Sequence, residues 1–130
     1  MSACLVKRCK RRPTPSGRCK THLKQKADQL FSVFIRRRDM WCAALGRDCK
    51  RPLQCAHIVS RRYLATRWDE QNAIALCLGH HKFFTEHPLE WEVWLEAHLP
   101  GRLVKMKRRA LGIANVDDPI NADEAVRRYA

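Results

Sequence analysis

The chain has 130 residues, enough for one domain with a modest hydrophobic core. Its 26 lysine and arginine residues outnumber 13 aspartate and glutamate residues, and the formal net charge of +13 favours a polyanionic partner such as DNA. Because no run of about 18 apolar residues occurs and no apolar segment follows the charged N-terminus, we expect no membrane-spanning helix, no signal peptide, no membrane partner and a cytoplasmic protein.

The seven cysteines are more consistent with metal binding than with disulfides. A reducing cytoplasm disfavours disulfide bonds, and an odd number of cysteines would leave one thiol unpaired. Zinc sites built from mixed cysteine and histidine ligands have no such parity requirement.

The first 24 residues combine cysteine, histidine and basic residues with almost no apolar periodicity. Such a segment cannot form a core unaided, and zinc would supply the missing folding free energy. Four residues have a spacing suited to one zinc ion: Cys4, Cys9, Cys19 and His22. We therefore predict a zinc-binding knuckle over residues 1–24; the alternative is a set of scattered thiols in a disordered basic arm.

An amphipathic helix is predicted from about Gln25 to Met40, because apolar residues recur there at helical spacing. Turn-forming residues, β-branched residues and basic residues then alternate in blocks. These blocks predict, in chain order, a ribbon over 41–52, a strand over 53–60, a basic loop over 60–71, a strand over 72–77 and a helix from residue 79.

Pro88 is expected at the first position of the next helix, which the apolar pattern extends to about residue 99. A basic helix over 102–111 follows, and Asn121 with Glu124 resembles the capping box of a short final helix. We divide the chain into the knuckle, a central domain over residues 25–99 and a basic helical extension over 100–130.

A second group with zinc-ligand spacing lies around the two predicted strands. It comprises Cys42, Cys49, Cys77 and His80, and it would join the ribbon and the strands to the helix that follows. Cys55 is close enough in sequence to replace Cys49 as a ligand. We favour a buried or supporting position for Cys55.

The most informative stretch is QCAHIVSRRYLATRWDEQNAIALCLGHHKFF, where His57, Asn72 and His81 occur in that order. With the CxHI strand, the TRWD loop and the LCxxxH turn, this stretch resembles the HNH endonuclease family, and the small phage HNH proteins in particular. The resemblance covers residues 40 to about 95. It implies an α+β fold with a small zinc-stabilised ββα-metal core and flanking helices.

The resemblance also implies a role for each of these residues. His57 would be the general base, since neutral imidazole can take a proton from water near pH 7. Asn72 would hold the loop between the strands, and His81 would ligate a catalytic Mg, Mn, Ni or Zn ion. The phosphate would be bound by arginines of the basic loop: Arg61, Arg62 and Arg67.

The chain departs from the family pattern at two positions. Ala56 stands where many HNH proteins place a metal ligand before the base, so water, the substrate phosphate, Asp69 or His87 would have to fill that position. His87 itself is more consistent with a helix cap or a surface residue. His80 stands where a fourth structural cysteine is usual, which gives a Cys3His site that zinc accepts.

The sequence thus predicts a metal-dependent DNA endonuclease, phage-encoded and acting in packaging, recombination or DNA processing, with phage packaging or recombination proteins as further partners. The alternative is a zinc-finger protein that binds nucleic acid without cutting it. Other basic clusters, at residues 7–12, 36–38 and 105–109, are expected to attract the nucleic-acid backbone without reading sequence.

Overall fold

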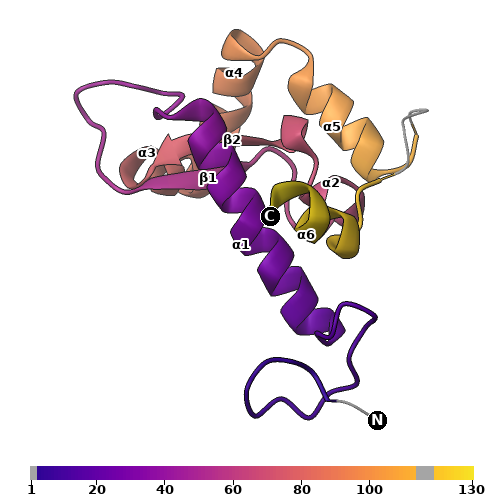
Figure 1. Ribbon diagram of the computed structural model, residues 1–130. Helices are drawn as coiled ribbons and strands as arrows, with labels where there is room; N and C mark the ends of the chain where they lie inside the picture. The colour runs from indigo at the N-terminus through magenta and orange to yellow at the C-terminus, as the bar shows by residue number, and fades with distance from the viewer. Residues whose placement is uncertain (1–2, 114–118) are drawn as a thin grey trace.

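The computed structural model describes residues 3–113 and 119–130 as a small α+β structure (Figure 1). A long helix, α1, lies beside a two-stranded sheet, and shorter helices follow. The elements are α1 (Lys20–Asp39), β1 (Leu53–His57), α2 (Leu64–Arg67), η1 (Glu70–Asn72), β2 (Ala73–Cys77), α3 (Leu78–Glu86), α4 (Pro88–His98), α5 (Arg102–Ala110) and α6 (Ala122–Tyr129).

The two strands pair in antiparallel fashion, with His57 opposite Ala73 and Leu53 opposite Cys77. Every residue of β2 is buried, which its apolar sequence AIALC explains. The predicted strand over 53–60 ends at His57, while Ile58 and Val59 are buried beyond it. His57 therefore stands at the end of β1 where the chain leaves the sheet.

The largest core lies between α1, the sheet and α6. Ala27, Phe31 and Ile35 recur every four residues on one face of α1 and are almost fully buried. They pack with Trp68, Ala73 and α6, whose Tyr129 ring meets Phe31 with centroids 5.2 Å apart. Figure 1 shows α6 lying alongside the middle of α1.

The helix predicted from Gln25 begins earlier, at Lys20, and runs through the boundary drawn at residue 24. Its first turn, KTHLK, carries too few apolar residues to show helical periodicity. The basic loop over 60–71 contains two short elements that were not predicted, α2 and η1. Pro88 occupies the first turn of α4, and Asn121 Oδ1 accepts a hydrogen bond from Glu124 N at the start of α6, both as predicted.

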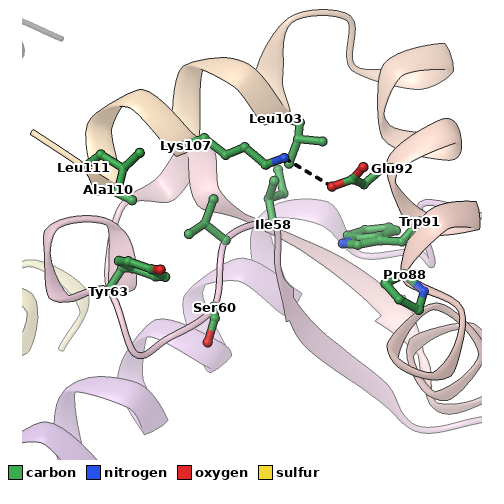
Figure 2. Close-up of a pocket in the computed structure, with 11 residues that line it drawn as sticks. Ile58, Ser60, Tyr63, Pro88, Trp91, Glu92, Leu103, Lys107, Ala110 and Leu111 are labelled. Carbon is green, nitrogen blue, oxygen red and sulfur yellow. Dashed lines mark hydrogen bonds and ion pairs between the residues drawn. The ribbon is translucent and has the colours of Figure 1, made fainter. Parts of the chain in front are cut away.

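Helix α4 packs against the sheet through one smaller apolar cluster, and α4 and α5 pack on Ile58 and Val59 beyond β1 through another. Between them and residues 58–63 lies a mostly apolar pocket of about 420 Å³, crossed at its rim by an ion pair of 3.2 Å between Lys107 and Glu92 (Figure 2). Among the described residues, none of the helices combines the length and the apolar character needed to span a bilayer.

Candidate functional site

Two groups of three cysteines and one histidine each bring four ligand atoms within 4.8 Å of one another. The N-terminal Cys3His group consists of Cys4, Cys9, Cys19 and His22. In this group His22 Nδ1 lies 3.3 Å from Cys4 Sγ and 3.2 Å from Cys19 Sγ. Around tetrahedral zinc with Zn–S bonds of about 2.3 Å, neighbouring ligand atoms are roughly 3.5 to 3.8 Å apart. The group therefore fits a structural zinc ion.

The second Cys3His group consists of Cys42, Cys49, Cys77 and His80. His80 Nδ1 lies 3.1 Å from Cys77 Sγ and 3.4 Å from Cys42 Sγ. Burial raises the pKa of the Cys77 thiol, but hydrogen bonds from backbone N–H groups, including that of His80, outweigh it and lower the pKa to about 6. Cys77 is therefore readily available as the thiolate that zinc binds.

The two groups share a local geometry that fixes the start of a helix. Cys19 is the N-cap of α1 and Cys77 is the N-cap of α3, both in an extended conformation with φ of −67°. The histidine three residues later lies in the first turn, so the two ligands of each Cys-x-x-His pair face the same side. Zinc at these positions would stabilise the first turns of α1 and α3.

A cavity of about 780 Å³ opens between α1, β1, the loop after β1 and α3. It contains both histidines that the sequence singled out as catalytic, His57 from β1 and His81 from α3. The residues that line it are Asp28, Ser32, Arg36, Pro52, Leu53, Gln54, Cys55, His57, Ser60, Arg61, His81 and Thr85. Its polar wall is thus drawn from four separate segments of the chain.

The His57 ring is held in one orientation by a backbone acceptor. Its Nε2 lies 2.9 Å from the carbonyl oxygen of Arg67, so Nε2 carries the proton and donates it. Nδ1 is then the unprotonated nitrogen. Burial lowers the pKa of His57 to about 4, and Arg61 acts in the same direction. The ring is therefore neutral near pH 7, with a lone pair on Nδ1.

The carbonyl that holds His57 belongs to a loop fastened to α1 by Asp28. The Asp28 carboxylate accepts hydrogen bonds from Arg67 Nε at 2.9 Å and Arg67 Nη2 at 2.6 Å. It also accepts one from Trp68 Nε1 at 3.0 Å. The Arg67 guanidinium is bound in this way and does not line the cavity, so its expected contact with phosphate stays a prediction.

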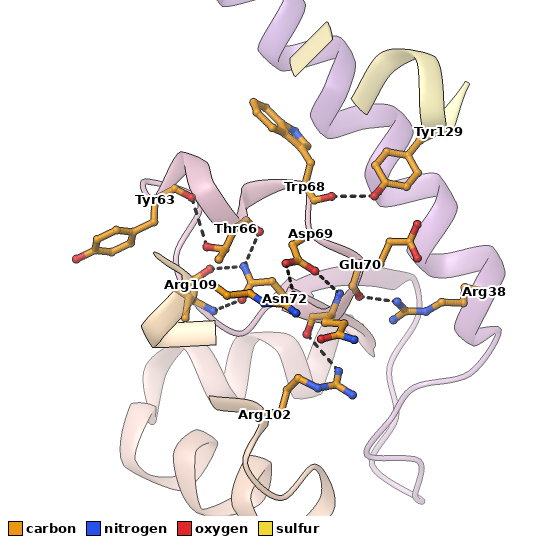
Figure 3. A network of polar contacts seen from close by, with 12 residues as sticks. Arg38, Tyr63, Thr66, Trp68, Asp69, Glu70, Asn72, Arg102, Arg109 and Tyr129 are labelled. Carbon is orange, nitrogen blue, oxygen red and sulfur yellow. Dashed lines mark hydrogen bonds and ion pairs between the residues drawn. The ribbon is translucent and has the colours of Figure 1, made fainter. Parts of the chain in front are cut away.

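Asn72 is fully buried and joins both ends of the loop between the strands (Figure 3). Its Oδ1 accepts from Val59 N at 2.8 Å, and its Nδ2 donates to the carbonyl oxygens of Val59 and Thr66, each at 3.0 Å. These bonds use both of its amide protons. They hold the loop between the strands together, and Asn72 lies outside the cavity.

His81 has its own positioning partner. Its Nδ1 lies 2.7 Å from Gln54 Oε1, so Nδ1 donates and Nε2 carries the lone pair. Burial lowers the pKa of His81, with Arg61 acting in the same direction. A neutral imidazole whose second N–H is held by an oxygen is the usual form of a histidine metal ligand.

Two arginines line the cavity, and one of them was predicted there. Arg61 lines it, with Nη1 3.7 Å from Asp28 Oδ2, and its side chain is largely exposed. Arg36 of α1 is the second. Arg62 is not a lining residue; its guanidinium lies over the Tyr63 ring at 5.9 Å. Of the predicted phosphate-binding set of Arg61, Arg62 and Arg67, only Arg61 lines the cavity, and Arg36, which was not predicted, lines it as well.

The residues considered as further ligands of a catalytic ion do not join His81. Ala56, which stands where many HNH proteins place a ligand, is buried in an apolar cluster of the sheet. Asp69 caps η1 and forms an ion pair of 2.7 Å with Arg109. His87 is stacked on Phe83 with its Nδ1 2.7 Å from the Phe83 carbonyl oxygen, and neither it nor Asp69 lines the cavity. Neither Asp69 nor His87 therefore forms a metal site together with His81.

Cys55 belongs to neither Cys3His group. It lines the cavity, and burial raises the pKa of its thiol to about 12, so it stays protonated. Sequence reasoning missed Asp28 and Gln54, because the bonds that give them importance join different elements. One signal was available: Asp28 and Arg36 are polar residues eight positions apart on one side of a helix whose opposite side is apolar.

No protein-family model, curated protein or solved structure matches the chain.

Proposed function

We propose that this protein is a metal-dependent phosphodiesterase of the HNH type that cuts DNA in the cavity between α1, β1 and α3. One observation carries the proposal: His57 and His81, from different elements, line the same cavity together with Arg36 and Arg61. Each histidine has one nitrogen fixed by a hydrogen bond and the other carrying a lone pair. This is the pairing that hydrolysis of a phosphodiester requires, with one base and one metal ligand.

In the proposed reaction His57 Nδ1 takes a proton from the water that attacks phosphorus. The bond from Nε2 to the Arg67 carbonyl keeps Nδ1 in the acceptor form and stabilises the ring once it is protonated. The low pKa of about 4 means that His57 is unprotonated at neutral pH, although it is also a weak base by itself. A bound phosphate would raise that pKa, because its negative charge favours the protonated ring.

Arg36 and Arg61 are assigned to the phosphate. Guanidinium groups pair with the non-bridging oxygens and favour the charge that develops on them. A divalent ion at His81 Nε2, when bound, supplies Lewis-acid polarisation of the phosphoryl oxygen and stabilisation of the leaving oxygen. Gln54 keeps His81 in the tautomer that leaves Nε2 available.

The +13 charge is consistent with DNA as the substrate, because a polyanion is attracted over the whole surface. A phage origin, with a role in packaging, recombination or DNA processing, belongs to the same proposal. The phage origin and this role depend only on the resemblance of residues 40–95 to the HNH family.

The decisive test is nicking of supercoiled plasmid by the zinc-loaded protein in the presence of Mg, Mn, Ni or Co ions. His57→Ala is expected to reduce cleavage by about 10² to 10⁴-fold, the usual contribution of a general base. His98→Ala is the matched control, since His98 is an exposed histidine of α4 outside the cavity. It should cut at the wild-type rate.

Both variants should keep the zinc content and the circular dichroism spectrum of the wild type. If the wild-type protein binds DNA but does not cut it with any of these ions, the second candidate gains support. That candidate is a non-catalytic zinc module that binds nucleic acid, favoured by the two Cys3His groups and the basic charge.

A further inference from the structure

The N-terminal arm, defined as residues 3–24, is strongly basic and lies away from the sheet at the far end of α1 (Figure 1). The sequence contains no aspartate or glutamate before Asp28. The basic residues of the arm are Lys7, Arg8, Lys10, Arg11, Arg12, Arg18, Lys20 and Lys24. A zinc ion with three thiolates would remove only one unit of this positive charge. The arm therefore carries a dense cationic surface that the cavity does not use.

The loop of the arm has a fixed shape. Backbone hydrogen bonds join Leu5 N to the Gly17 carbonyl at 2.7 Å and Thr14 N to the Arg18 carbonyl at 2.6 Å. The N-terminal Cys3His group fastens the loop to the first turn of α1. A hollow of about 570 Å³ beside it is lined largely by basic residues of the segment 6–11. These cations are thus presented by an ordered loop.

A row of residues on α1 connects the arm to the cavity. Residues four apart form a continuous ridge along a helix. One such ridge is Lys20, Lys24, Asp28, Ser32 and Arg36. Its last three members line the cavity, whereas its first two are basic residues next to the loop of the N-terminal arm. Asp28 does not interrupt the positive charge of the ridge, because Arg67 pairs with it.

The length of this ridge suits a rod-shaped polyanion. At 1.5 Å per residue, Lys20 lies about 18 Å from Ser32 along the helix axis. A strand of duplex DNA advances 3.4 Å per nucleotide, so the same length corresponds to about five base pairs. The loop of the N-terminal arm extends beyond the start of α1 (Figure 1).

We propose that the N-terminal arm is a second binding surface for the phosphate backbone of duplex DNA, which it contacts from about five base pairs beyond the bond held in the cavity. The distance to that bond rests on the proposed function; the binding surface itself does not. A duplex fits better than a single strand, because the first 30 residues contain no phenylalanine, tyrosine or tryptophan on which unpaired bases could stack.

The test measures binding without cleavage. All proteins carry His57→Ala and are zinc-loaded, and their affinity for a 20-base-pair duplex is measured by fluorescence anisotropy across a salt series. The arm variant combines Lys7→Gln, Lys10→Gln, Arg11→Gln and Lys20→Gln, four exposed residues. The control variant removes the same charge elsewhere on the surface with Lys105→Gln, Arg108→Gln, Arg127→Gln and Arg128→Gln.

Each phosphate contact contributes about 0.9 to the slope of log K against log salt. The arm variant should therefore reduce that slope by at least about two, and raise Kd more than about tenfold at 0.1 M salt. The control should change the slope by less than about one. Both variants should retain two zinc ions per chain, which shows that the Cys3His groups are intact.

Equal weakening by the two variants would overturn the proposal, because it would mean attraction by the whole surface. No weakening by the arm variant would overturn it as well. If the arm variant loses affinity for single-stranded DNA, for RNA or for anionic vesicles but not for the duplex, the assignment of duplex DNA is wrong. A protein that never cuts DNA leaves the measurement unaffected, so the two proposals fail independently.

Discussion

The orientation of His57 depends on residues far from it in the sequence. Its Nε2 donates to the Arg67 carbonyl, and the side chain of that same Arg67 is bound by Asp28 of α1. Asp28 therefore acts on His57 through one intervening residue, as a positioning residue in the proposed reaction. Residues that orient functional side chains in this way are themselves sensitive to substitution.

Asp28→Asn removes the charge that binds Arg67 while keeping the size of the side chain. If His57 is the base, kcat should fall by about 10 to 100-fold, the range typical of supporting residues. KM should change little, because Arg36 and Arg61 remain. Steady-state cleavage of a labelled duplex separates the two constants.

Glu92→Gln is the matched control for Asp28→Asn, since Glu92 forms an exposed ion pair with Lys107 outside the cavity. A fall in kcat that the control shares, or one explained by a fall in zinc content, would rule out the positioning role of Asp28.

At the scale of single residues, the sequence predicted what depends on spacing. Both Cys3His groups assemble as the spacing of their ligands indicated, because short Cys-x-x-His pairs constrain their own geometry. Gln54 and Asp28 could not be predicted in the same way. Their partners, His81 and Arg67, lie 27 and 39 positions away, and only the packing of α1 and α3 on the sheet brings them together.

At the scale of elements, the two Cys3His groups join different parts of the fold. The N-terminal group connects a loop to the first turn of α1. In the second group, Cys42 and Cys77 are buried in the same apolar cluster as Leu76 and Phe84. The second group is therefore part of a core. The first lies at the N-terminus of α1, a helix that is already packed in a core through Ala27, Phe31 and Ile35.

Loss of the first Cys3His group and loss of the second should therefore lower the stability of the protein by different amounts. Cys4→Ser is expected to leave one zinc ion per chain and to lower Tm only slightly. Cys77→Ser should unfold the protein or lower Tm far more, because the metal free energy there supports the sheet and α3. Native mass spectrometry counts the zinc ions, and calorimetry gives Tm. If Cys4→Ser and Cys77→Ser lowered Tm by the same amount, this difference between the groups would be contradicted.

Elements were predicted well where one periodicity covers the whole segment, as in α4 and α5, and poorly where ligands or capping replace apolar side chains. The first turn of α1 is one such place, since the helix follows the N-cap Cys19 and starts at Lys20, five residues before the predicted start. The short α2 and η1 are another. They are held by Asn72 and Asp69 side chains, which short-range patterns do not reveal.

At the scale of the whole molecule, α6 packs against α1 and Trp68 in the largest core. Tyr129 packs against Phe31 and Phe34, and its hydroxyl donates to the Trp68 carbonyl at 2.8 Å. Trp68 is itself almost fully buried and follows Arg67 directly. Contacts from α1 and α6 thus converge on Arg67, whose carbonyl holds His57, and on the next residue, Trp68. Composition and charge could indicate a small basic protein, but not this convergence.

Tyr129→Phe tests that convergence. The substitution keeps the ring and removes only the hydroxyl, which leaves the buried Trp68 carbonyl without its donor. The free energy of unfolding should fall by about 1 to 3 kcal/mol, the cost of an unsatisfied buried acceptor. Denaturant unfolding measures this, with Tyr63→Phe as control, because the hydroxyl of the exposed Tyr63 forms no hydrogen bond with the residues that the structure describes. A change below about 0.5 kcal/mol would mean that water replaces the hydroxyl.

The different chain spans of the two Cys3His groups have a consequence for biosynthesis. All four ligands of the first lie between residues 4 and 22, whereas the second needs His80 as well as Cys42. During translation the first set of ligands is complete some 58 residues earlier, or about 3 to 12 seconds at usual elongation rates. The first group could therefore bind zinc on the nascent chain while the second is still incomplete.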